Sequence, residues 1–359
     1  MRTSFCYRLS RLAPRPVVFL LPLFLGILLI GNPAVLRAAP RAADLVRNGQ
    51  PIDLGQAKYK KLFHELEAKH KFSPADLQAI FRGQTINKRV LELMDRQWEA
   101  KPYYQYAPLF LTKRNIETGR KKLRQYRKLL DRIEKKIGVD REIVIAIWGI
   151  ETHYGANQGS FSVLRTLNTL FDAYPRRSNF FRKQLVYFLL LCRQEGINPK
   201  TIRGSYAGAF GQTQFIPSSF SSYALSFDGD RKRDVWNSVP DILASIANYL
   251  KHFKWKLHAP IYAELGHELK DRRLVAASLK GRKGSVSWQL LRQVQRSDLP
   301  KPRDHAKLFI VGLELPPGAG ARMRYIACYP NFRAITEWNH SSRYAMAVCE
   351  LAEAFKRRQ

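Results

Sequence analysis

One glutamate in this chain is placed to act as an acid. Glu151 follows an almost unbroken apolar run over residues 143–150. Asp140 can cap the N-terminus of a helix through its carboxylate, and no proline interrupts the residues behind it. A helix that is apolar on nearly every face belongs in a core, and a carboxyl group at its end loses hydration, which raises its pKa. A general acid needs such a protonated group, although a glutamate at a helix end can also turn outward into solvent.

A second segment, residues 204–219, is rich in small and polar side chains. Small residues at this density let the backbone approach a ligand closely. Ser205, Gln212 and Gln214 suit a ligand with hydroxyl and amide groups. The segment lacks the glycine spacing and the preceding strand of a dinucleotide-binding loop. Close packing of helices is the alternative explanation for its glycines.

Helix signals dominate the rest of the chain. The sequence predicts a helix that begins at the cap Ser73 and others over residues 114–137, 178–195, 238–253 and 341–356. Strand signals are confined to residues 307–314 and 323–329, which predict a small hairpin. The charged segment 268–283 is predicted to be an exposed excursion.

The N-terminus has the layout of a secretory signal. Arginines between residues 2 and 15 precede an apolar stretch over residues 17–30, and small residues follow at Ala38 and Ala39. We expect residues 1–39 to be a cleaved signal peptide and the mature protein to be periplasmic. An uncleaved anchor is the alternative, although the stretch is shorter than the roughly 20 residues of a spanning helix. Of the three cysteines beyond it, Cys328 and Cys349 could form a disulfide.

The formal net charge of +32 predicts an anionic partner. A secreted chain rarely meets nucleic acid, so we expect no nucleic-acid partner. Anionic polymers of the cell envelope are the expected peripheral partners. The basic residues over 114–137 have helical spacing, and an ordinary solvated helix face is the alternative reading of that segment.

Four blocks carry a family resemblance. Residues 146–155, 204–219, 235–238 and 329–339 occur in this order and at this separation. Together they closely resemble the membrane-bound lytic murein transglycosylase B family over residues 54–356. The absence of a cysteine just after the apolar N-terminal stretch separates this chain from the lipoprotein members of that family, which favours a soluble form.

The resemblance implies a mainly α fold: a lysozyme-like helical catalytic core with additional helices and a small β-hairpin or sheet near the C-terminus. We expect one lytic transglycosylase domain over residues 40–359. Its helical core covers about 54–256 and 329–359, and a small charged, β-containing insertion covers about 257–328. A monomer is expected.

The resemblance also implies the site. Glu151 matches the single catalytic acid/base of the family. Eight further residues are predicted to bind substrate: Ser205, Gln214, Arg176, Arg177, Tyr206, Asn331, Phe332 and Tyr106. The serine and glutamine would line the cleft at the reacting N-acetylmuramic acid, and the arginine pair would face peptide or lactyl carboxylates. The last three would border the cleft or stack on a sugar. Core packing is an equal alternative for Tyr106.

The mechanism that fits a single acid is the lytic transglycosylase reaction. Most glycosidases use two carboxyl groups, and the nearest other acid, Asp172, looks like a helix or turn residue. We expect peptidoglycan glycan strands to be cleaved between N-acetylmuramic acid and N-acetylglucosamine without water, which leaves a 1,6-anhydro end. The alternatives are a lysozyme-type muramidase that uses water and a non-catalytic peptidoglycan-binding protein.

A calcium loop of the family falls at residues 226–237. Ser226 stands where an acid is usual, Arg231 stands where the turn favours glycine, and Asn237 is neutral at the last ligand position. We therefore expect no required cofactor and at most a weak calcium site, with the ligands Asp228, Asp230 and Asp234.

Overall fold

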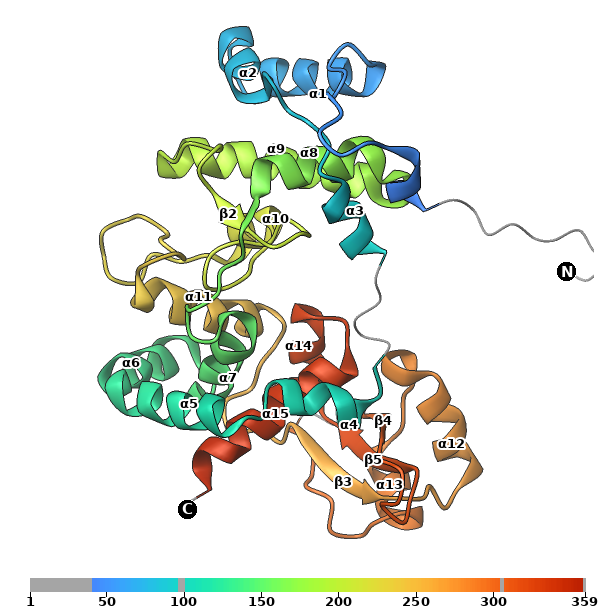
Figure 1. The fold of residues 1–359 in the computed structure, drawn as a ribbon. Helices are drawn as coiled ribbons and strands as arrows, with labels where there is room; N and C mark the ends of the chain where they lie inside the picture. The colour runs from blue at the N-terminus through green and yellow to red at the C-terminus, as the bar shows by residue number, and fades with distance from the viewer. Residues whose placement is uncertain (1–40, 96–100, 304–306, 358–359) are drawn as a thin grey trace, which may run out of the picture. The chain divides into compact units, whose positions relative to one another are not determined.

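The part of the chain that the structure describes is mostly helical, as the sequence predicts (Figure 1). The computed structural model describes residues 41–95, 101–303 and 307–357. The predicted signal segment, residues 1–39, lies outside the described residues. Within the described residues no helix is both long enough and apolar enough to cross a bilayer.

One group of helices packs around a first core, named here the upper core. It comprises α1 (Ala57–Ala68), α2 (Pro74–Phe81), α3 (Lys88–Met94), α8 (Val163–Ala173), α9 (Ser178–Glu195) and α10 (Pro217–Tyr223). The predicted cap is confirmed, because the Ser73 hydroxyl accepts a bond of 3.0 Å from the N–H of Asp76. The predicted helix α9 is also confirmed, and it ends at Gly196 with a left-handed φ of 69°.

A second core, named here the lower core, surrounds the helix that carries Glu151. Its helices are α4 (Tyr103–Tyr106), α5 (Lys113–Gln125), α6 (Arg127–Ile137), α7 (Arg141–Thr152), α11 (Val239–His252), α14 (Pro330–Trp338) and α15 (Ser342–Lys356). Residues 143–150 are all buried, which confirms that α7 is covered on nearly every face.

The long basic segment is two helices rather than one. The chain bends at Tyr126, which separates α5 from α6. The ring of Tyr126 lies 6.1 Å from that of Trp148 on α7, so the bend lets an aromatic side chain pack on the buried helix. Periodicity alone did not predict this interruption, because both halves carry the same amphipathic pattern.

Asp140 occupies the N-cap position of α7, but its side chain does not cap the helix. Its carboxylate instead accepts hydrogen bonds from Trp255 Nε1 at 2.8 Å and from the backbone N–H of His258 at 3.3 Å. The prediction of a side-chain cap is therefore wrong. Asp140 ties the start of α7 to the segment that follows α11.

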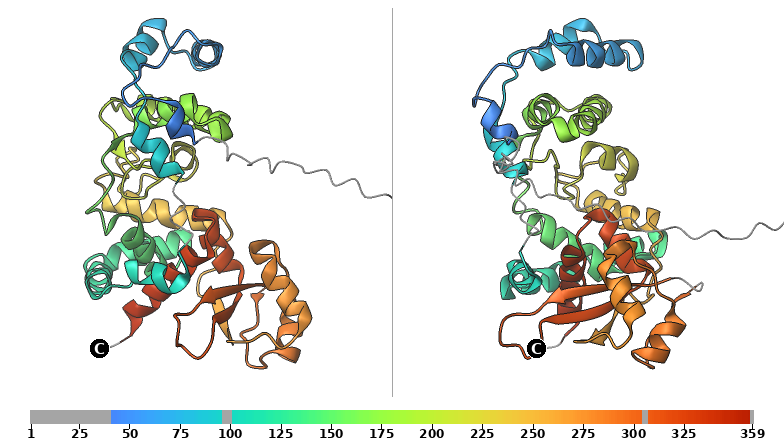
Figure 2. Two further views of the ribbon diagram at one scale, coloured as in Figure 1. Left: turned by 45° about the vertical axis from the view of Figure 1, so that its right-hand side comes forward. Right: turned by 90° about the vertical axis from the view of Figure 1, so that its right-hand side faces the viewer.

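A three-stranded antiparallel sheet lies beside the lower core. Its order is β3 (Tyr262–Gly266), β5 (Met323–Cys328) and β4 (Phe309–Glu314). The β4–β5 hairpin confirms the prediction, with Phe309 opposite Cys328 and Glu314 opposite Met323. Figure 2 shows α12 (Arg272–Leu279) and α13 (Trp288–Val294) beside these strands.

The sequence reading missed β3 and α12. The segment 268–283 is not a simple exposed excursion, because Leu274 and Ala277 on α12 are buried in a small cluster with residues of the sheet. The segment is mostly charged, so the helical spacing of its two buried apolar residues was not recognised. Leu274 and Ala277 are three residues apart and therefore lie on one face of the helix.

The three described cysteines do not pair. Cys192, Cys328 and Cys349 are free, buried thiols. Burial raises the pKa of the Cys192 thiol to about 12, so this group stays protonated at neutral pH.

Candidate active site

Glu151 lies in the last turn of α7, where two other helices bring hydrogen-bond donors to it. Trp338 at the end of α14 donates from Nε1 to Glu151 Oε1 at 2.9 Å. Tyr344 on α15 donates its hydroxyl to the same oxygen at 2.7 Å. Within the described ranges no donor reaches Oε2. The carboxyl group is therefore oriented through one oxygen, and the other is left for a substrate.

Burial sets the protonation state of this acid. Loss of hydration raises the pKa of Glu151 to about 7, although the hydrogen bonds from Tyr344 and Trp338 oppose the shift. Burial also raises the pKa of the Tyr344 phenol well above its usual value, so Tyr344 remains a neutral donor. Because Oε1 already accepts two bonds, the acidic proton belongs on Oε2.

The turn after α7 fixes the neighbouring segment. His153 and Tyr154 have left-handed φ angles of 48° and 59°, and Gly155 follows at 92°. A Cβ on Gly155 would lie 2.3 Å from Gln212 Oε1, so only glycine fits beside this amide. Gln212 Oε1 in turn accepts a bond of 2.9 Å from Trp148 Nε1 on α7. The 204–219 segment is thus joined directly to the helix of the acid.

Three predicted substrate residues, Ser205, Tyr206 and Gln214, lie on this segment. Ser205 follows β2 (Arg203–Gly204), which pairs with β1 (Phe161–Ser162), and its Oγ accepts bonds from the N–H groups of Ala207 and Ala209 at 3.2 and 3.1 Å. These bonds leave the Ser205 hydroxyl hydrogen able to donate. Tyr206, in the same turn, is half-buried.

Gln214 has a left-handed φ of 48°, and its amide is held by the backbone. Its Nε2 donates to the carbonyls of Gly211 at 2.9 Å and Gln158 at 3.2 Å. This arrangement leaves the Gln214 Oε1 atom as the acceptor that a ligand can use.

Gly204 packs against the backbone of its own segment. A Cβ on Gly204 would lie 2.1 Å from the carbonyl oxygen of Ala209. Close packing, the alternative left open by the sequence, therefore accounts for this glycine without a ligand.

An aromatic contact joins the segment to the acid. The ring of Phe215 lies 5.2 Å from that of Trp338, and the ring of Tyr249 lies 4.7 Å from that of Trp338. Trp338 packs against both the upper and the lower core. One indole therefore couples the polar segment, both cores and the Glu151 carboxyl group.

The other predicted residues differ in their surroundings. Arg176 and Arg177 are exposed just before α9, and the guanidinium of Arg177 lies 4.3 Å above the ring of Phe180. Neither arginine bonds to Glu151 in the described parts of the chain. Tyr106 is 8% exposed and packs 5.2 Å from Phe110, which favours the core-packing alternative for this residue.

Asn331 and Phe332 lie inside the protein. They are 1% and 0% exposed. Asn331 accepts a bond from the N–H of Lys256 and donates to its carbonyl, at 2.9 and 2.8 Å. Phe332 packs its ring 5.9 Å from Phe309. Phe332 offers no surface to a sugar, and Asn331 lines only a small hollow with Lys256 and Tyr329, so the structure does not place either side chain beside Glu151.

The sequence reading missed the two donors to Glu151. Trp338 lies in the matched block 329–339 and Tyr344 lies just after it, but Asn331 and Phe332 were predicted from this block instead. The sequence could have indicated these donors, because a buried Trp or Tyr needs a hydrogen-bond acceptor for its N–H or O–H group. The other acid that was considered, Asp172, is engaged elsewhere in an ion pair of 2.6 Å with Lys58.

The predicted calcium loop gathers a different set of acids. Carboxylate oxygens of Asp228, Asp230 and Asp241 lie within 4.8 Å of one another. Asp234 is not among them; its carboxylate accepts bonds of 2.9 Å from the N–H groups of Trp236 and Asn237. The predicted ligand Asp234 is therefore replaced by Asp241, which the sequence presented only as a residue in the first turn of α11.

These three acids fit a hard cation. Calcium prefers several carboxylate and carbonyl oxygens, and the buried Asp241 supplies one from a rigid helix. Arg231 adopts a left-handed φ of 69°, so the turn forms without the usual glycine. Asp241 also accepts bonds from the N–H groups of Phe227 and Asp234 at 2.6 and 3.0 Å, which engage part of its binding capacity.

With this geometry established, comparison with known proteins decides the family. A model described as Transglycosylase SLT domain matches residues 55–353. The chain belongs to this family. It is 33% identical over 296 residues to the membrane-bound lytic murein transglycosylase B of Escherichia coli, with 80% of this chain and 79% of the relative covered. The resemblance seen in the four sequence blocks is thus confirmed.

Solved structures agree. Escherichia coli lytic transglycosylase Slt35 in complex with calcium matches with a TM-score of 0.75 at 30% identity, over 89% of this chain and 98% of that chain. SltB3 from Pseudomonas aeruginosa in complex with NAG-anhNAM-pentapeptide matches with a TM-score of 0.70 at 32% identity, over 83% and 79%. The predicted mainly α, lysozyme-like fold with a small sheet near the C-terminus is confirmed.

We expect Tyr344→Phe to shift the pH dependence of turnover toward higher pH. Loss of the hydroxyl removes one bond that favours the ionised carboxylate, so the pKa of Glu151 should rise further. The acidic form then persists to higher pH, while the less well oriented acid should lower the maximal rate by about tenfold or more. The measurement is turnover of a soluble glycan between pH 5 and 9. Tyr187→Phe, at an exposed position on α9, is the control. A profile midpoint that does not move, or moves downward, contradicts the assignment.

Proposed function

We propose that this protein is a lytic transglycosylase that cleaves the β-1,4 bond between N-acetylmuramic acid and N-acetylglucosamine in peptidoglycan. The observation that supports this most strongly is a single half-buried carboxyl group, oriented by two donors and protonated up to about pH 7. No second acid within the described residues bonds to Glu151 or its two donors. The lytic murein transglycosylase named among its relatives supports the same substrate.

In the first step, Glu151 donates the Oε2 proton to the glycosidic oxygen as the bond to the anomeric carbon breaks. The leaving sugar departs with a hydroxyl group, and Glu151 becomes a carboxylate whose Oε1 still accepts bonds from Tyr344 and Trp338. These bonds favour the ionised form, so they help the proton to leave. The acid is thus neutral before the step and stabilised after it.

In the second step, the Glu151 carboxylate takes the proton of the 6-hydroxyl of the same muramic acid. That oxygen attacks the anomeric carbon and closes the 1,6-anhydro ring. No water is consumed, and Glu151 regains its proton. The attack is intramolecular, so proximity lowers its barrier.

The cationic sugar between the two steps needs stabilisation. The N-acetyl group of the muramic acid can share the positive charge through its carbonyl oxygen. Ser205 can donate to that group through its free hydroxyl hydrogen, and Gln214 Oε1 can accept from an N–H or hydroxyl group of the sugar. Both side chains are held by backbone bonds before substrate arrives, which reduces the reorganisation needed.

Glu151→Gln should abolish release of anhydro-muropeptides while wall binding is kept. Glutamine retains the shape of the side chain, and its amide oxygen can accept the same hydrogen bonds. Its amide has no acidic proton to transfer to the glycosidic oxygen. General acid–base catalysis contributes roughly 10²–10⁴-fold, so the loss will exceed assay scatter. The measurement is mass spectrometry of digested peptidoglycan, with the exposed Glu117→Gln on α5 as the matched control. Products heavier by one water would identify a muramidase, and near-normal anhydro product from Glu151→Gln would contradict the assignment of the acid.

The proposed location is the periplasm. A signal peptide over residues 1–39 would direct export and then be removed, and the mature chain would act as a monomer.

Calcium is proposed to bind weakly to Asp228, Asp230 and Asp241 in a structural role, with no part in the reaction. The Slt35 structure in complex with calcium supports this assignment. Asp228 and Asp230 lie on the loop before α11 and Asp241 in its first turn, and none of the three bonds to Glu151.

Calcium should raise the melting temperature by a few degrees and leave the lytic rate unchanged. Binding to the folded state alone stabilises it by mass action, and the acids do not touch the reacting groups. Melting and turnover are compared in EDTA and in millimolar calcium, with magnesium as the ion control. Asp230→Asn should remove the thermal shift. A lytic rate that collapses in EDTA would show that calcium is required for catalysis.

The basic face of α5 and α6 is proposed to contact anionic polymers of the envelope. Six exposed cations on it make no ion pair within the described parts of the chain: Arg114, Lys121, Arg124, Arg127, Lys128 and Arg132. The acids on the same two helices are paired, since Asp131 and Glu134 both pair with Arg141 and Glu117 pairs with Lys113. This face therefore presents a strong and unopposed positive field.

Binding to purified walls should depend on this face and on salt. Replacing Arg124, Arg127, Lys128 and Arg132 by glutamine should weaken binding to insoluble walls by about tenfold or more at low salt, and the difference should shrink at 0.5 M salt. The matched control replaces four exposed lysines of the α1 region, Lys60, Lys61, Lys69 and Lys71. Equal losses in both variants would show that only net charge matters.

A further inference from the structure

A hollow lies outside the hydrogen-bond network of Glu151. It is bordered by the turn at Gln158, by the end of α9, by β2 and by the loop before α11. Its volume is about 570 Å³. None of the residues that line it bonds to Glu151, Trp338 or Tyr344 within the described residues. A volume of this size accommodates one sugar with a short substituent. The hollow is therefore large enough for a ligand, and its lining makes no hydrogen bond to the acid or to its two donors within the described residues.

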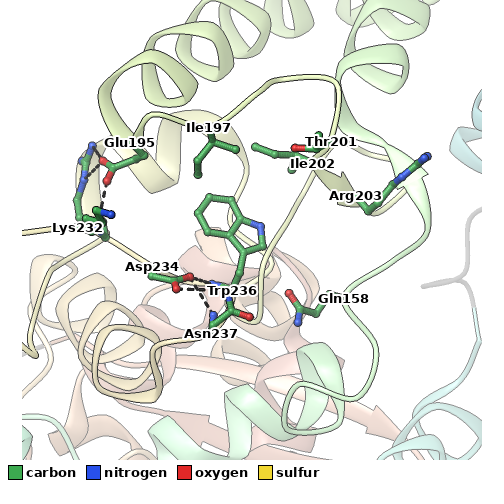
Figure 3. A pocket seen from close by; sticks show the side chains of 11 residues that line it. Gln158, Glu195, Ile197, Thr201, Ile202, Arg203, Lys232, Asp234, Trp236 and Asn237 are labelled. Atoms are coloured by element: carbon green, nitrogen blue, oxygen red, sulfur yellow. Dashed lines mark hydrogen bonds and ion pairs between the residues drawn. The ribbon is translucent and has the colours of Figure 1, made fainter.

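Trp236 stands in the middle of this hollow (Figure 3). Its ring stacks on Phe210 at 5.4 Å and 10° and also lies 5.9 Å from the ring of Phe220, so two aromatic side chains hold the half-buried indole while its remaining surface lines the hollow. Its backbone is fixed, because the N–H donates to Asp234 Oδ1 at 2.9 Å and the carbonyl accepts from Gln212 Nε2 at 2.7 Å. The indole N–H donates to no group in the described residues. The hollow thus offers a rigid apolar face with a free donor at its edge.

Two cations that are unpaired within the described residues line the hollow. Lys232 and Arg203 are exposed and lie on opposite sides of the indole (Figure 3), and neither makes an ion pair in the described part of the chain. The nearby acid Glu195 is neutralised by Arg233, whose Nε lies 2.8 Å from Glu195 Oε1. The carboxylate of Asp234 is engaged by backbone N–H groups. The charges left for a ligand are therefore positive, which favours a carboxylate.

Amide groups complete the hollow. The Gln158 side chain lines it and makes no hydrogen bond to another described residue, so both its acceptor and its donors are available. Its backbone carbonyl accepts from Gln214 Nε2 at 3.2 Å. An N-acetylated sugar that bears a carboxylate matches these groups. Its ring can stack on the indole, its N-acetyl group can bond to the Gln158 amide, and its carboxylate can pair with a cation.

We infer that this hollow is an accessory site for an N-acetylmuramyl peptide. The sugar ring lies on the indole of Trp236, its N-acetyl group bonds to Gln158, and a peptide carboxylate pairs with Lys232 or Arg203. The inference rests on the proposed function, because it takes its ligand from the same polymer. The site holds a part of the wall that is not being cleaved, which keeps the enzyme on its substrate between cuts.

Indole N–H resonances test the site in the mature Glu151→Gln protein, where no turnover occurs. The chain has six tryptophans, and Trp236→Phe identifies the resonance of Trp236. Titration with muramyl dipeptide should shift this resonance saturably at millimolar concentration. The neutral disaccharide N,N′-diacetylchitobiose should bind at least about tenfold more weakly, since it lacks the carboxylate. No response of Trp236, or an equal response to both probes, overturns the inference.

A charge variant provides the second arm. Arg203→Gln with Lys232→Gln should weaken muramyl dipeptide binding at Trp236 by about tenfold or more. The matched control, Lys270→Gln with Arg272→Gln, removes two exposed cations of the α12 region and should bind within about twofold of the parent. Equal binding by the two double variants contradicts the site. With Glu151 intact, the double pocket variant should still form anhydro product from a soluble glycan.

The two proposals fail in different ways. If Trp236 responds but the protein with Glu151 forms no anhydro product, the proposed reaction is wrong and the binding site stands. If anhydro product forms and Trp236 does not respond, the reaction stands and the accessory site is wrong.

Discussion

The Glu151 carboxyl group is held between two opposed effects, and the site depends on their balance. Burial at the end of an apolar helix favours the neutral acid, while two hydrogen bonds to Oε1 favour the carboxylate. Burial is the larger effect, so the pKa of the group rises to about 7. An exposed glutamate would be ionised at neutral pH, and one without donors would lack a fixed orientation. The arrangement yields an acid that is protonated at rest and able to lose its proton.

This balance requires distant parts of the chain to meet. The acid comes from α7, and its donors come from α14 and α15, 187 and 193 residues further along. Trp338 is fixed in turn by the rings of Phe215 and Tyr249. The upper and lower cores both contact this indole, so packing throughout the domain determines where the donor lies.

The arrangement has a cost in stability. The folded-state pKa of Glu151 is raised above its ordinary value of 4.5, so the neutral group is favoured by folding. Its contribution to the free energy of unfolding is fully present below about pH 4.5 and is lost as the pH rises through about 7. A shift of this size corresponds to about 3 kcal/mol at most. The catalytic acid therefore destabilises the fold at alkaline pH, and the two cores must offset that loss.

Local features of the chain were predictable from the sequence, and long-range ones were not. The apolar run before Glu151 indicated both the buried helix and the raised pKa, because each follows from neighbouring residues. Two short runs rich in β-branched and aromatic residues, separated by proline and glycine, likewise indicated the β4–β5 hairpin. The partnership of Trp338 with Glu151 depends on tertiary packing, which no local pattern encodes.

The differences at the site have the same origin. Asn331 was predicted to border the cleft because a polar residue in a matched block suggests a ligand contact. Its amide instead satisfies the backbone of Lys256 in the interior. Asp241 was overlooked because an acid in the first turn of a helix has an ordinary local role, and only the fold brings it to Asp228 and Asp230.

The central claim is the protonation state of one carboxyl group, and its direct titration is the most decisive measurement. Glutamate side-chain carboxyl carbons are labelled with ¹³C, and the Glu151 resonance is identified by its absence in Glu151→Gln. Its chemical shift is then followed between pH 3 and 9. The account predicts a midpoint at about 7 for this group. A midpoint near the ordinary value of 4.5 would mean that the acid is already ionised at neutral pH, and the proposed first step would then lack its proton.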